Sequence, residues 1–479
     1  MGERSGKAVL ADGSAVTTTM TPHQSITNRA NGSDPTPAPA GGETPRIPFG
    51  LIDEVIHLLD TETAPWSIQL ELRVAGHLDE DRLRQALATA LAAHPMARAR
   101  KVAAWPGLPR HQWEIPAAVD VDPLRVVDCA DDAAVAAARA QLQSRPVPLV
   151  ESPPLRVRLA RHPDGDFLML NVNHAAMDGF GALRVVRSLA RAYRGDADPA
   201  ADPDFLEARQ VPARLADADF RTKVGRGLAL AEKVRDLVVP PARLAPEGAS
   251  GGAGYGFHQV CLSPSGTQAV LDHDHPGTVN DLLVAALHRT IGEWNAGHGV
   301  RRGRVGVLVP ANLRPAEWRQ DVVGNFSLPA RVSSTRRHRR TSAATLRAVT
   351  AQTRRMKRTG MGTALVGVLS RAGRYPLWAK EATVMMMPLT GNRLVDTAML
   401  SNLGQLADPP SFGADAGEVT EVWFSPPARM PLGLSVGAVT ANGRLHLVFR
   451  YRHRLFDDRS AARFADRYLA ELASFATPA

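Results

Sequence analysis

The chain has 479 residues, too many for a single ordinary core, which favours two domains of about 200 residues each. Hydrophobic residues make up 44% of the sequence and charged residues 22%, a balance that excludes a disordered protein. The formal net charge of +9 is compatible with nucleic acid, an anionic membrane, or a phosphate-bearing or acidic partner, and by itself it selects none of them.

Three features of the sequence indicate the compartment in which we expect the protein. They are the spacing of the cysteines, the length of the apolar runs and the composition of the first residues. Cys129 and Cys261 have no CxxC or CxxH spacing, so we expect neither a disulfide framework nor a metal site. No run of about 18 apolar residues occurs, and residues 1–50 lack the apolar segment of a secretory signal. We therefore expect a cytoplasmic protein without a transmembrane segment. Residues 1–46, rich in Gly, Ser, Thr, Pro and Ala, are predicted to form a disordered leader.

The first ordered elements alternate between helix and strand. A short helix is predicted to begin near Pro48. Strict alternation of apolar and polar residues over Ser67–Val74 predicts a strand with one face on a core. Asp79 then caps a helix that ends at His94 and Pro95, because proline disfavours helix in the residue before it.

A helix and a hairpin follow. The alanine-rich pattern over Asp131–Ser144 is helical, and strands over Leu155–Leu159 and Phe167–Asn173 flank a turn at residues 163–166. The hairpin brings His174 to a strand end. A further helix is expected from about Gly181 to Tyr193, with an apolar face and a second face of arginines: Arg184, Arg187, Arg191 and Arg194.

The segment from Pro240 to Gly256 is rich in proline and glycine and shows little periodicity. We predict that it links two subdomains. The predicted boundaries are an N-terminal subdomain over 47–240, a linker over 241–256 and a C-terminal subdomain over 257–479.

The second half begins with a helix at Thr278, where Asp281 completes a capping box. A strand is predicted over Val305–Val309, a hairpin around the turn Asn442-Gly443, and a last amphipathic helix over Ser460–Phe475. The helix that begins at Thr278 is predicted to bury a face formed by Leu283, Leu287, Ile291 and Trp294.

The strongest local signal for chemistry is the segment from Asn173 to Gly179, sequence NHAAMDG. A histidine at a strand end is held rigidly by the sheet, and its ring can take a proton from a hydroxyl or amine. Asp178, in a turn with Gly179, is better placed to anchor that turn than to relay protons. On spacing alone, a satisfied core histidine remains the alternative to a catalytic one.

This segment resembles the HHxxxDG motif of the superfamily that holds chloramphenicol acetyltransferases, condensation domains and wax ester synthase/diacylglycerol acyltransferases. Other pieces resemble that family in the same order along the chain. They are Leu78 to Pro95, Pro153 to Arg156, Thr278 to Asp281, Asn312 to Pro315, Gly324 to Phe326, and Ser401 to Gly404. The resemblance covers about Pro48 to Phe475.

The resemblance implies an α/β fold of two similar subdomains with mixed sheets, arranged as a V around a central channel. His174 would be the general base and Asp178 would form a structural ion pair, with Arg314 as the expected partner. Gly179 and Asn173 would support the site, and Asn325 and Ser327 are candidates for the oxyanion or the channel. Asn173 departs from the motif, because the family has a histidine there.

The implied function is transfer of an acyl group from a coenzyme A or carrier-protein thioester to a small-molecule alcohol or amine, in bacterial secondary metabolism. No cofactor is expected to stay bound, and the thioester is a co-substrate. We expect a monomer that binds no nucleic acid. Two alternatives stay open: a repurposed enzyme that catalyses hydrolysis or cyclisation, and a degenerate docking protein.

The densest positive charge lies in two groups of basic residues. A solvated helix face is one interpretation; the other is a docking patch for the phosphates of coenzyme A or for an acidic carrier protein. No base-stacking aromatic residues are interleaved, so nucleic acid is not predicted. The groups are Arg336, Arg337, Arg339 and Arg340, and Arg354, Arg355, Lys357 and Arg358.

Three other motifs suggest different chemistry. Ser435 lies in a GxSxG sequence, but the residues after it lead into a hairpin and not into the helix that a hydrolase nucleophile needs, so we predict an ordinary strand. Asp272 to His275 has metal-ligating side chains without distant partners, and a solvated turn is predicted. The glycines of residues 251–256 follow no strand and predict no phosphate loop.

Overall fold

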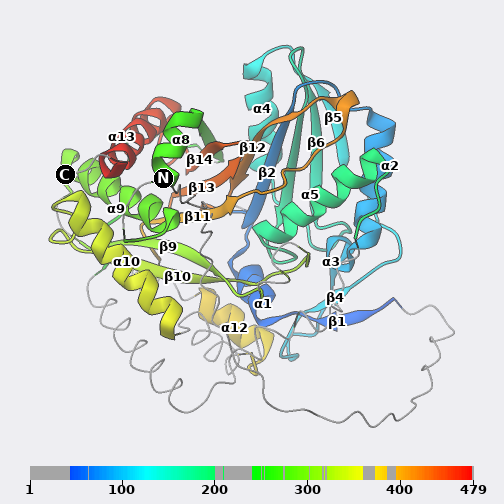
Figure 1. Cartoon of the computed structure of the whole chain (residues 1–479). Coiled ribbons are helices and arrows are strands. Elements are labelled where there is room, and N and C mark those ends of the chain that lie inside the picture. Colours follow the sequence, from blue (N-terminus) through cyan, green and yellow to red (C-terminus); the bar gives the residue numbers. More distant parts are fainter. Residues whose placement is uncertain are drawn as a thin grey trace, which may run out of the picture. The chain divides into compact units, whose positions relative to one another are not determined.

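Residues that are far apart in the sequence share the sheets of this protein (Figure 1). The computed structural model describes residues 44–62, 64–199, 209, 240–249, 251, 252, 254–272, 276–300, 303–315, 318, 321–359, 373–385 and 395–476. Within these residues three sheets form, of five, six and three strands.

The five-stranded sheet carries the hairpin that was predicted from the sequence. Its order is β12 (Val419–Ser425), β2 (Ser67–Val74), β7 (Phe167–Asn173), β6 (Leu155–Arg161) and β5 (Leu124–Asp128). Strands β5 and β6 are parallel and the other pairs antiparallel, so the sheet is mixed. Its edge strand β12 comes from the second half of the chain, which the sequence analysis did not predict.

Helices cover both faces of this sheet. Alternate residues of β7 point to opposite sides. Leu168, Leu170 and Val172 pack in the core formed with α2 (Glu80–Ala93) and α5 (Gly179–Arg194). Phe167 and Met169 pack with α4 (Asp132–Gln143). The predicted cap of α2 is confirmed, because the Asp79 carboxylate accepts the Arg82 N–H; the Asp131 carboxylate caps α4 in the same way through the Ala134 N–H.

The predicted strand is confirmed in β2, and its apolar face lies in the core of the five-stranded sheet. The polar residues of the other face are buried as well, with Gln69 1% and Glu71 2% exposed. Two bonds of 2.6 Å join the Glu71 carboxylate to the Arg139 guanidinium on α4, and Gln259 donates to the same carboxylate at 3.3 Å. The polar face of β2 is therefore an internal polar contact and does not face solvent.

The arginine face of α5 is also less solvated than its pattern suggested. Arg184 is buried and forms an ion pair with Asp198 at 3.0 Å. Arg187 is buried and donates to the Asp408 carbonyl at 3.0 Å. The first half of this face therefore packs against other segments of the chain.

The second half of the chain builds the six-stranded sheet. Its order is β10 (Ser327–Ser334), β9 (Val305–Asn312), β11 (Ala398–Gln405), β13 (Leu434–Ala441), β14 (Arg444–Arg452) and β8 (Tyr255–Cys261). Strand β11 runs parallel to β9 and β13, so this sheet is mixed too. The hairpin turn is confirmed: Asn442 and Gly443 have φ values of 50° and 68°, as a tight turn of this kind requires.

Helices pack on one face of this sheet. The capping box of α9 (Val279–Gly297) is confirmed, and its predicted apolar face lies in a core shared with α13 (Asp458–Ala476). The helices α8 (Pro264–Leu271), α10 (Ser342–Thr359) and α12 (Leu377–Met385) belong to the same half of the sequence. On the opposite side of the sheet, Val439 and Ala441 join the core of the five-stranded sheet.

A small antiparallel sheet adds three short strands. They are β1 (Arg46–Pro48), β4 (Gln112–Glu114) and β3 (Arg100–Val102). The remaining short elements are α1 (Leu51–Leu59), α3 (Pro95–Arg98) and the 3₁₀ turn η3 (Ala414–Ala416).

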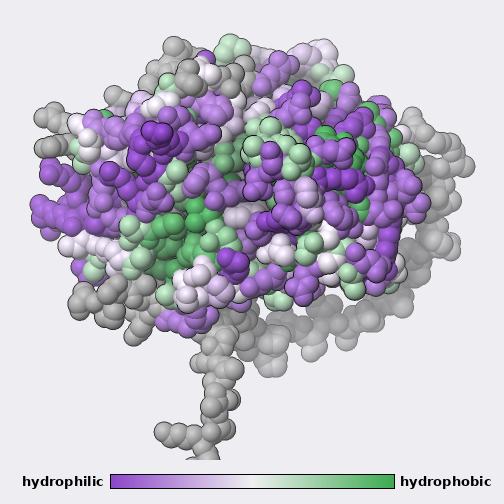
Figure 2. Space-filling view, turned by 90° about the horizontal axis from the view of Figure 1, so that it is seen from above, coloured by the Kyte–Doolittle hydropathy of each residue, from purple (hydrophilic) through white to green (hydrophobic). Residues whose placement is uncertain are grey.

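The predicted subdomain boundaries stay predictions. Most of the predicted leader lies outside the described residues, and Arg46, at its end, already belongs to β1. In the predicted linker, Leu244 and Ala245 are buried in the core of the six-stranded sheet. Hydrophilic residues dominate the face shown in Figure 2, with hydrophobic residues gathered in a few places.

Candidate functional site

The backbone of His174 is fixed from two sides. The residue follows the last residue of β7, and its N–H donates to the Trp66 carbonyl at 3.2 Å. Its own carbonyl accepts a bond of 2.6 Å from the side-chain amide of Asn325. The first contact comes from the segment that enters β2 and the second from the segment that precedes β10. Both halves of the chain therefore hold the histidine.

The His174 side chain lies in a water-poor environment. The residue is 8% exposed, and no group in the described part of the chain hydrogen-bonds its buried Nδ1. Burial lowers the pKa of His174 below the usual 6.5, while the Asp178 carboxylate and nearby backbone groups oppose that shift. Burial therefore favours the neutral form of the imidazole. A channel that reaches the ring remains a prediction.

Asp178 is the anchor of the loop after His174. Its Oδ1 accepts from the Gly181 N–H at 3.0 Å and so caps α5. Its Oδ2 accepts from Arg314 at 2.6 Å, from the Phe326 N–H at 3.0 Å and from the Ser327 hydroxyl at 3.0 Å. Burial disfavours the charged carboxylate, but the Arg314 charge and these donors outweigh it and hold the pKa of Asp178 below its usual value.

Arg314 is the partner that the resemblance implied, and the ion pair is fully buried. The second guanidinium nitrogen donates to the carbonyls of Val322 and Gly324 at 3.2 and 3.0 Å. The guanidinium also lies 4.5 Å from the centre of the Phe326 ring. The arginine thus holds the segment 322–326 against the loop of Asp178.

Asn173 stands where the motif has its first histidine. The nitrogen and the oxygen of its side-chain amide are both hydrogen-bonded within the protein. Its amide donates to the Asp60 carboxylate at 2.8 Å and to the Val147 carbonyl at 2.9 Å, and its oxygen accepts from the Ala175 N–H at 3.0 Å. Asp60 also accepts from the Trp66 N–H at 2.7 Å. Asn173 therefore shapes the turn that presents His174.

Asn325 and Ser327 were candidates for an oxyanion hole, and the structure gives both another contact. The Asn325 amide donates to the His174 carbonyl, and the Ser327 hydroxyl donates to Asp178. The Ser327 bond uses the only hydrogen of that hydroxyl, and the Asn325 bond uses one of the two hydrogens of that amide. The contacts favour a role for both residues in support of the loop.

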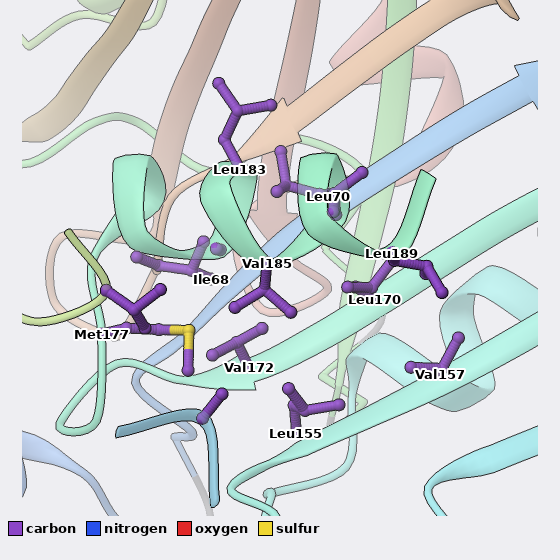
Figure 3. Packing of buried hydrophobic residues seen from close by; sticks show 14 of the residues in the cluster. Ile68, Leu70, Leu155, Val157, Leu170, Val172, Met177, Leu183, Val185 and Leu189 are labelled. Atoms are coloured by element: carbon purple, nitrogen blue, oxygen red, sulfur yellow. The ribbon is translucent and has the colours of Figure 1, made fainter. Parts of the chain in front are cut away.

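Gly179 allows a close approach between α5 and the two large sheets. A Cβ at this position would lie 2.9 Å from the Phe424 ring on β12 and 3.0 Å from the Leu403 side chain on β11. Figure 3 shows Met177 beside the start of α5, and Val185 and Leu189 directed toward the strands below. The glycine of the motif is therefore required by packing.

We expect Gly179→Ala to destabilise the protein by about 1–3 kcal/mol, because the added methyl group overpacks this contact. The measurement is the free energy of unfolding in urea. Gly297→Ala is the matched control: Gly297 ends α9, and its Cβ would meet no atom within 4 Å. Equal stability of the two variants would contradict the packing argument.

Of the rival motifs, that of Ser435 lies wholly within the described residues. Ser435 lies within β13, fully buried, and its hydroxyl donates to the Pro426 carbonyl at 2.9 Å, so the prediction of an ordinary strand is confirmed. Asp272 ends α8, and residues 273–275 lie outside the described residues. In the described ranges no three metal-ligating side chains gather, and no helix is long and apolar enough to span a bilayer.

Comparison with known proteins agrees with this arrangement. The family model of the condensation domain matches residues 55–207, which include the loop of His174. The epimerization domain of the third module of tyrocidine synthetase B superposes with a TM-score of 0.65, covering 91% of this chain and 97% of that one. The SgcC5 protein of Streptomyces globisporus gives 0.62, with 89% and 98% covered. Both are 17% identical to this chain, so they show the fold.

The chain belongs to the superfamily of condensation domains and chloramphenicol acetyltransferases, a fold of two α/β subdomains with mixed sheets. A full-length relative is uncharacterized protein Rv2305 of Mycobacterium tuberculosis (strain ATCC 25618 / H37Rv). It is 35% identical over 433 residues, which cover 89% of this chain and 98% of the relative. Acyl or peptidyl transfer, with substrates bound to carrier proteins, is the chemistry of condensation domains.

Proposed function

We propose that this protein transfers an acyl group from a thioester to an alcohol or an amine, with His174 as the general base. The observation that carries the proposal is an imidazole whose residue is fixed at the end of β7 by contacts from both halves of the chain, in a buried position that lowers its pKa. A neutral imidazole can accept the proton of the attacking hydroxyl or amine. The thioester is bound on coenzyme A or on the phosphopantetheine of a carrier protein.

The neighbouring carboxylate is unsuited to take the proton. Four donors surround Asp178, and the Arg314 charge keeps it ionised. A carboxylate stabilised in this way is a weak base. Asp178 and Arg314 therefore position the loop, and the base is left to His174.

The acceptor is a small molecule, and the protein needs no resident cofactor in this scheme. The nucleophile attacks the thioester carbonyl as its proton moves to His174. The tetrahedral intermediate then collapses, and the thiol leaves with a proton returned from the imidazolium. Alignment of nucleophile and carbonyl supplies much of the remaining rate enhancement.

The experiment that tests the proposal is mass spectrometry of the products formed from a panel of acyl thioesters and candidate acceptors. Acyl transfer predicts an acylated acceptor and free thiol in equal amounts. Hydrolysis predicts free acid that forms without an acceptor. A docking protein would yield neither product while still binding substrate, and either of these last two results would overturn the proposal.

A further inference from the structure

A second candidate site lies in the half of the chain that contains the six-stranded sheet. A cavity of about 490 Å³ opens between α9, the start of β9 and the turn that joins β10 to α10. Its volume falls in the range of about 300–1,000 Å³ that is usual for small-molecule sites. Part of its wall is apolar, formed by Ala242, Ala296, Val300 and Val305.

The charged part of the wall is strongly positive. Arg289 is neutralised by Glu471, in a two-bond contact, and by Glu293 at 2.8 Å. Arg336, Arg339 and Arg340 also line the cavity, and they form no ion pair with any described residue. Glu293 also lines the cavity, but its carboxylate pairs with Arg289, so the other three guanidinium groups face this space without an ion-pair partner among the described residues.

Arg339 is held in place before any ligand arrives. Its Nη1 donates to the Ser334 carbonyl at 2.6 Å and to the Ser334 hydroxyl at 2.9 Å. Gly292 on α9 makes room for it, since a Cβ there would lie 2.8 Å from Arg339 Nε. The side chain is half-buried, and burial lowers the pKa of Arg339 to about 10. A fixed guanidinium binds a tetrahedral oxyanion at little cost in conformational entropy.

The cavity is distinct from the site of His174. Strand β10 connects the two, because Ser327 at its start contacts Asp178 and Ser334 at its end contacts Arg339. The seven residue-to-residue steps from Ser327 to Ser334 span about 23 Å in an extended strand. The basic residues 336–340 lie in a turn and not on the helix face that one interpretation of the sequence expected.

We propose that this cavity binds the phosphate groups of a nucleotide-sized ligand, with Arg336, Arg339 and Arg340 on the phosphates and the apolar wall against the base or sugar. Guanidinium groups match phosphate oxygens in bidentate geometry. The ligand is either a free nucleotide or the nucleotide portion of coenzyme A, and both present the same chemistry.

The test is isothermal titration calorimetry of the full chain with adenosine 3',5'-bisphosphate, coenzyme A, ATP and phosphate-free pantetheine. We expect the three phosphorylated compounds to bind, with an affinity that falls as the salt concentration rises. Pantetheine should not bind. The double variant Arg336→Ala/Arg340→Ala should weaken binding by about tenfold or more. Arg454→Ala/Arg459→Ala is the control, since it removes the same charge from exposed positions elsewhere.

The outcomes distinguish coenzyme A from a free nucleotide as the ligand, and they include two results that would overturn the proposal. Equal affinity for coenzyme A and the bisphosphate assigns the site to coenzyme A, and binding of ATP alone assigns it to a free nucleotide. Equal losses in the two double variants would overturn the proposal, because they indicate unspecific attraction. So would binding of an acidic carrier protein, lost in Arg336→Ala/Arg340→Ala, without binding of any nucleotide. None of these measurements depends on acyl transfer, so the proposed function can fail separately.

Discussion

Replacing His174 with alanine is expected to reduce turnover by a factor of about 10²–10⁴, the usual contribution of a general base. The fold should persist, because the backbone contacts that hold residue 174 do not involve the imidazole. His174→Gln, which keeps more of the side-chain volume, should lose turnover to a similar degree. The measurement is the steady-state rate of acyl transfer, with the unfolding midpoint of each variant as a check on folding.

The pH dependence of the wild-type rate provides an independent test. The base must be unprotonated, so turnover should rise with pH through the pKa of His174 and then level off. Because burial lowers this pKa below 6.5, the midpoint of the rise should lie below pH 6.5. A rate that rises only above pH 7, or a His174→Gln variant that keeps most of its turnover, would contradict the role of this residue.

Replacing Asp178 with asparagine is expected to destabilise the fold by about 3–5 kcal/mol. The substitution leaves Arg314 as an unpaired charge in the interior, and such a loss costs far more than removal of a surface pair. It also weakens the cap of α5 and the bonds to the segment 325–327. The measurement is the free energy of unfolding in urea.

Asp196→Asn is the matched control for this substitution. Asp196 pairs with Arg194 at the protein surface, where an ion pair contributes about 0–1 kcal/mol. We also expect Asp178→Asn to lower turnover, since the loop that presents His174 loses its anchor. Similar stabilities for the two asparagine variants would show that the buried pair is not the anchor inferred here.

Much of the local structure could be predicted because its signals are local. The capping aspartate of α2, the capping box of α9 and the Asn442-Gly443 turn act within a few residues. The hairpin that ends at His174 was also readable from two apolar runs and a turn. The resemblance to a known motif then supplied the pairing of Asp178 with Arg314, which lie 136 residues apart.

What could not be predicted depends on partners that are distant in the sequence. The burial of the polar face of β2 could not be predicted, because Arg139 is 68 residues from Glu71, and Gln259 is 188 residues away. Residues Trp66 and Asp60, which fix the backbone around His174, carry no motif of their own. The contacts of Asn325 with His174 and of Ser327 with Asp178 could not be predicted either, because 151 and 149 positions of sequence separate the partners.

Because of strand β12, we expect the first half of the chain to aggregate when it is produced without the second half. This strand belongs to the second half of the sequence and closes the five-stranded sheet along β2 in antiparallel register. A fragment cut within the segment 240–256 would leave β2 with a bare row of backbone donors and acceptors, a known template for aggregation. The halves should therefore be produced together, or the first half should carry a grafted copy of residues 419–425.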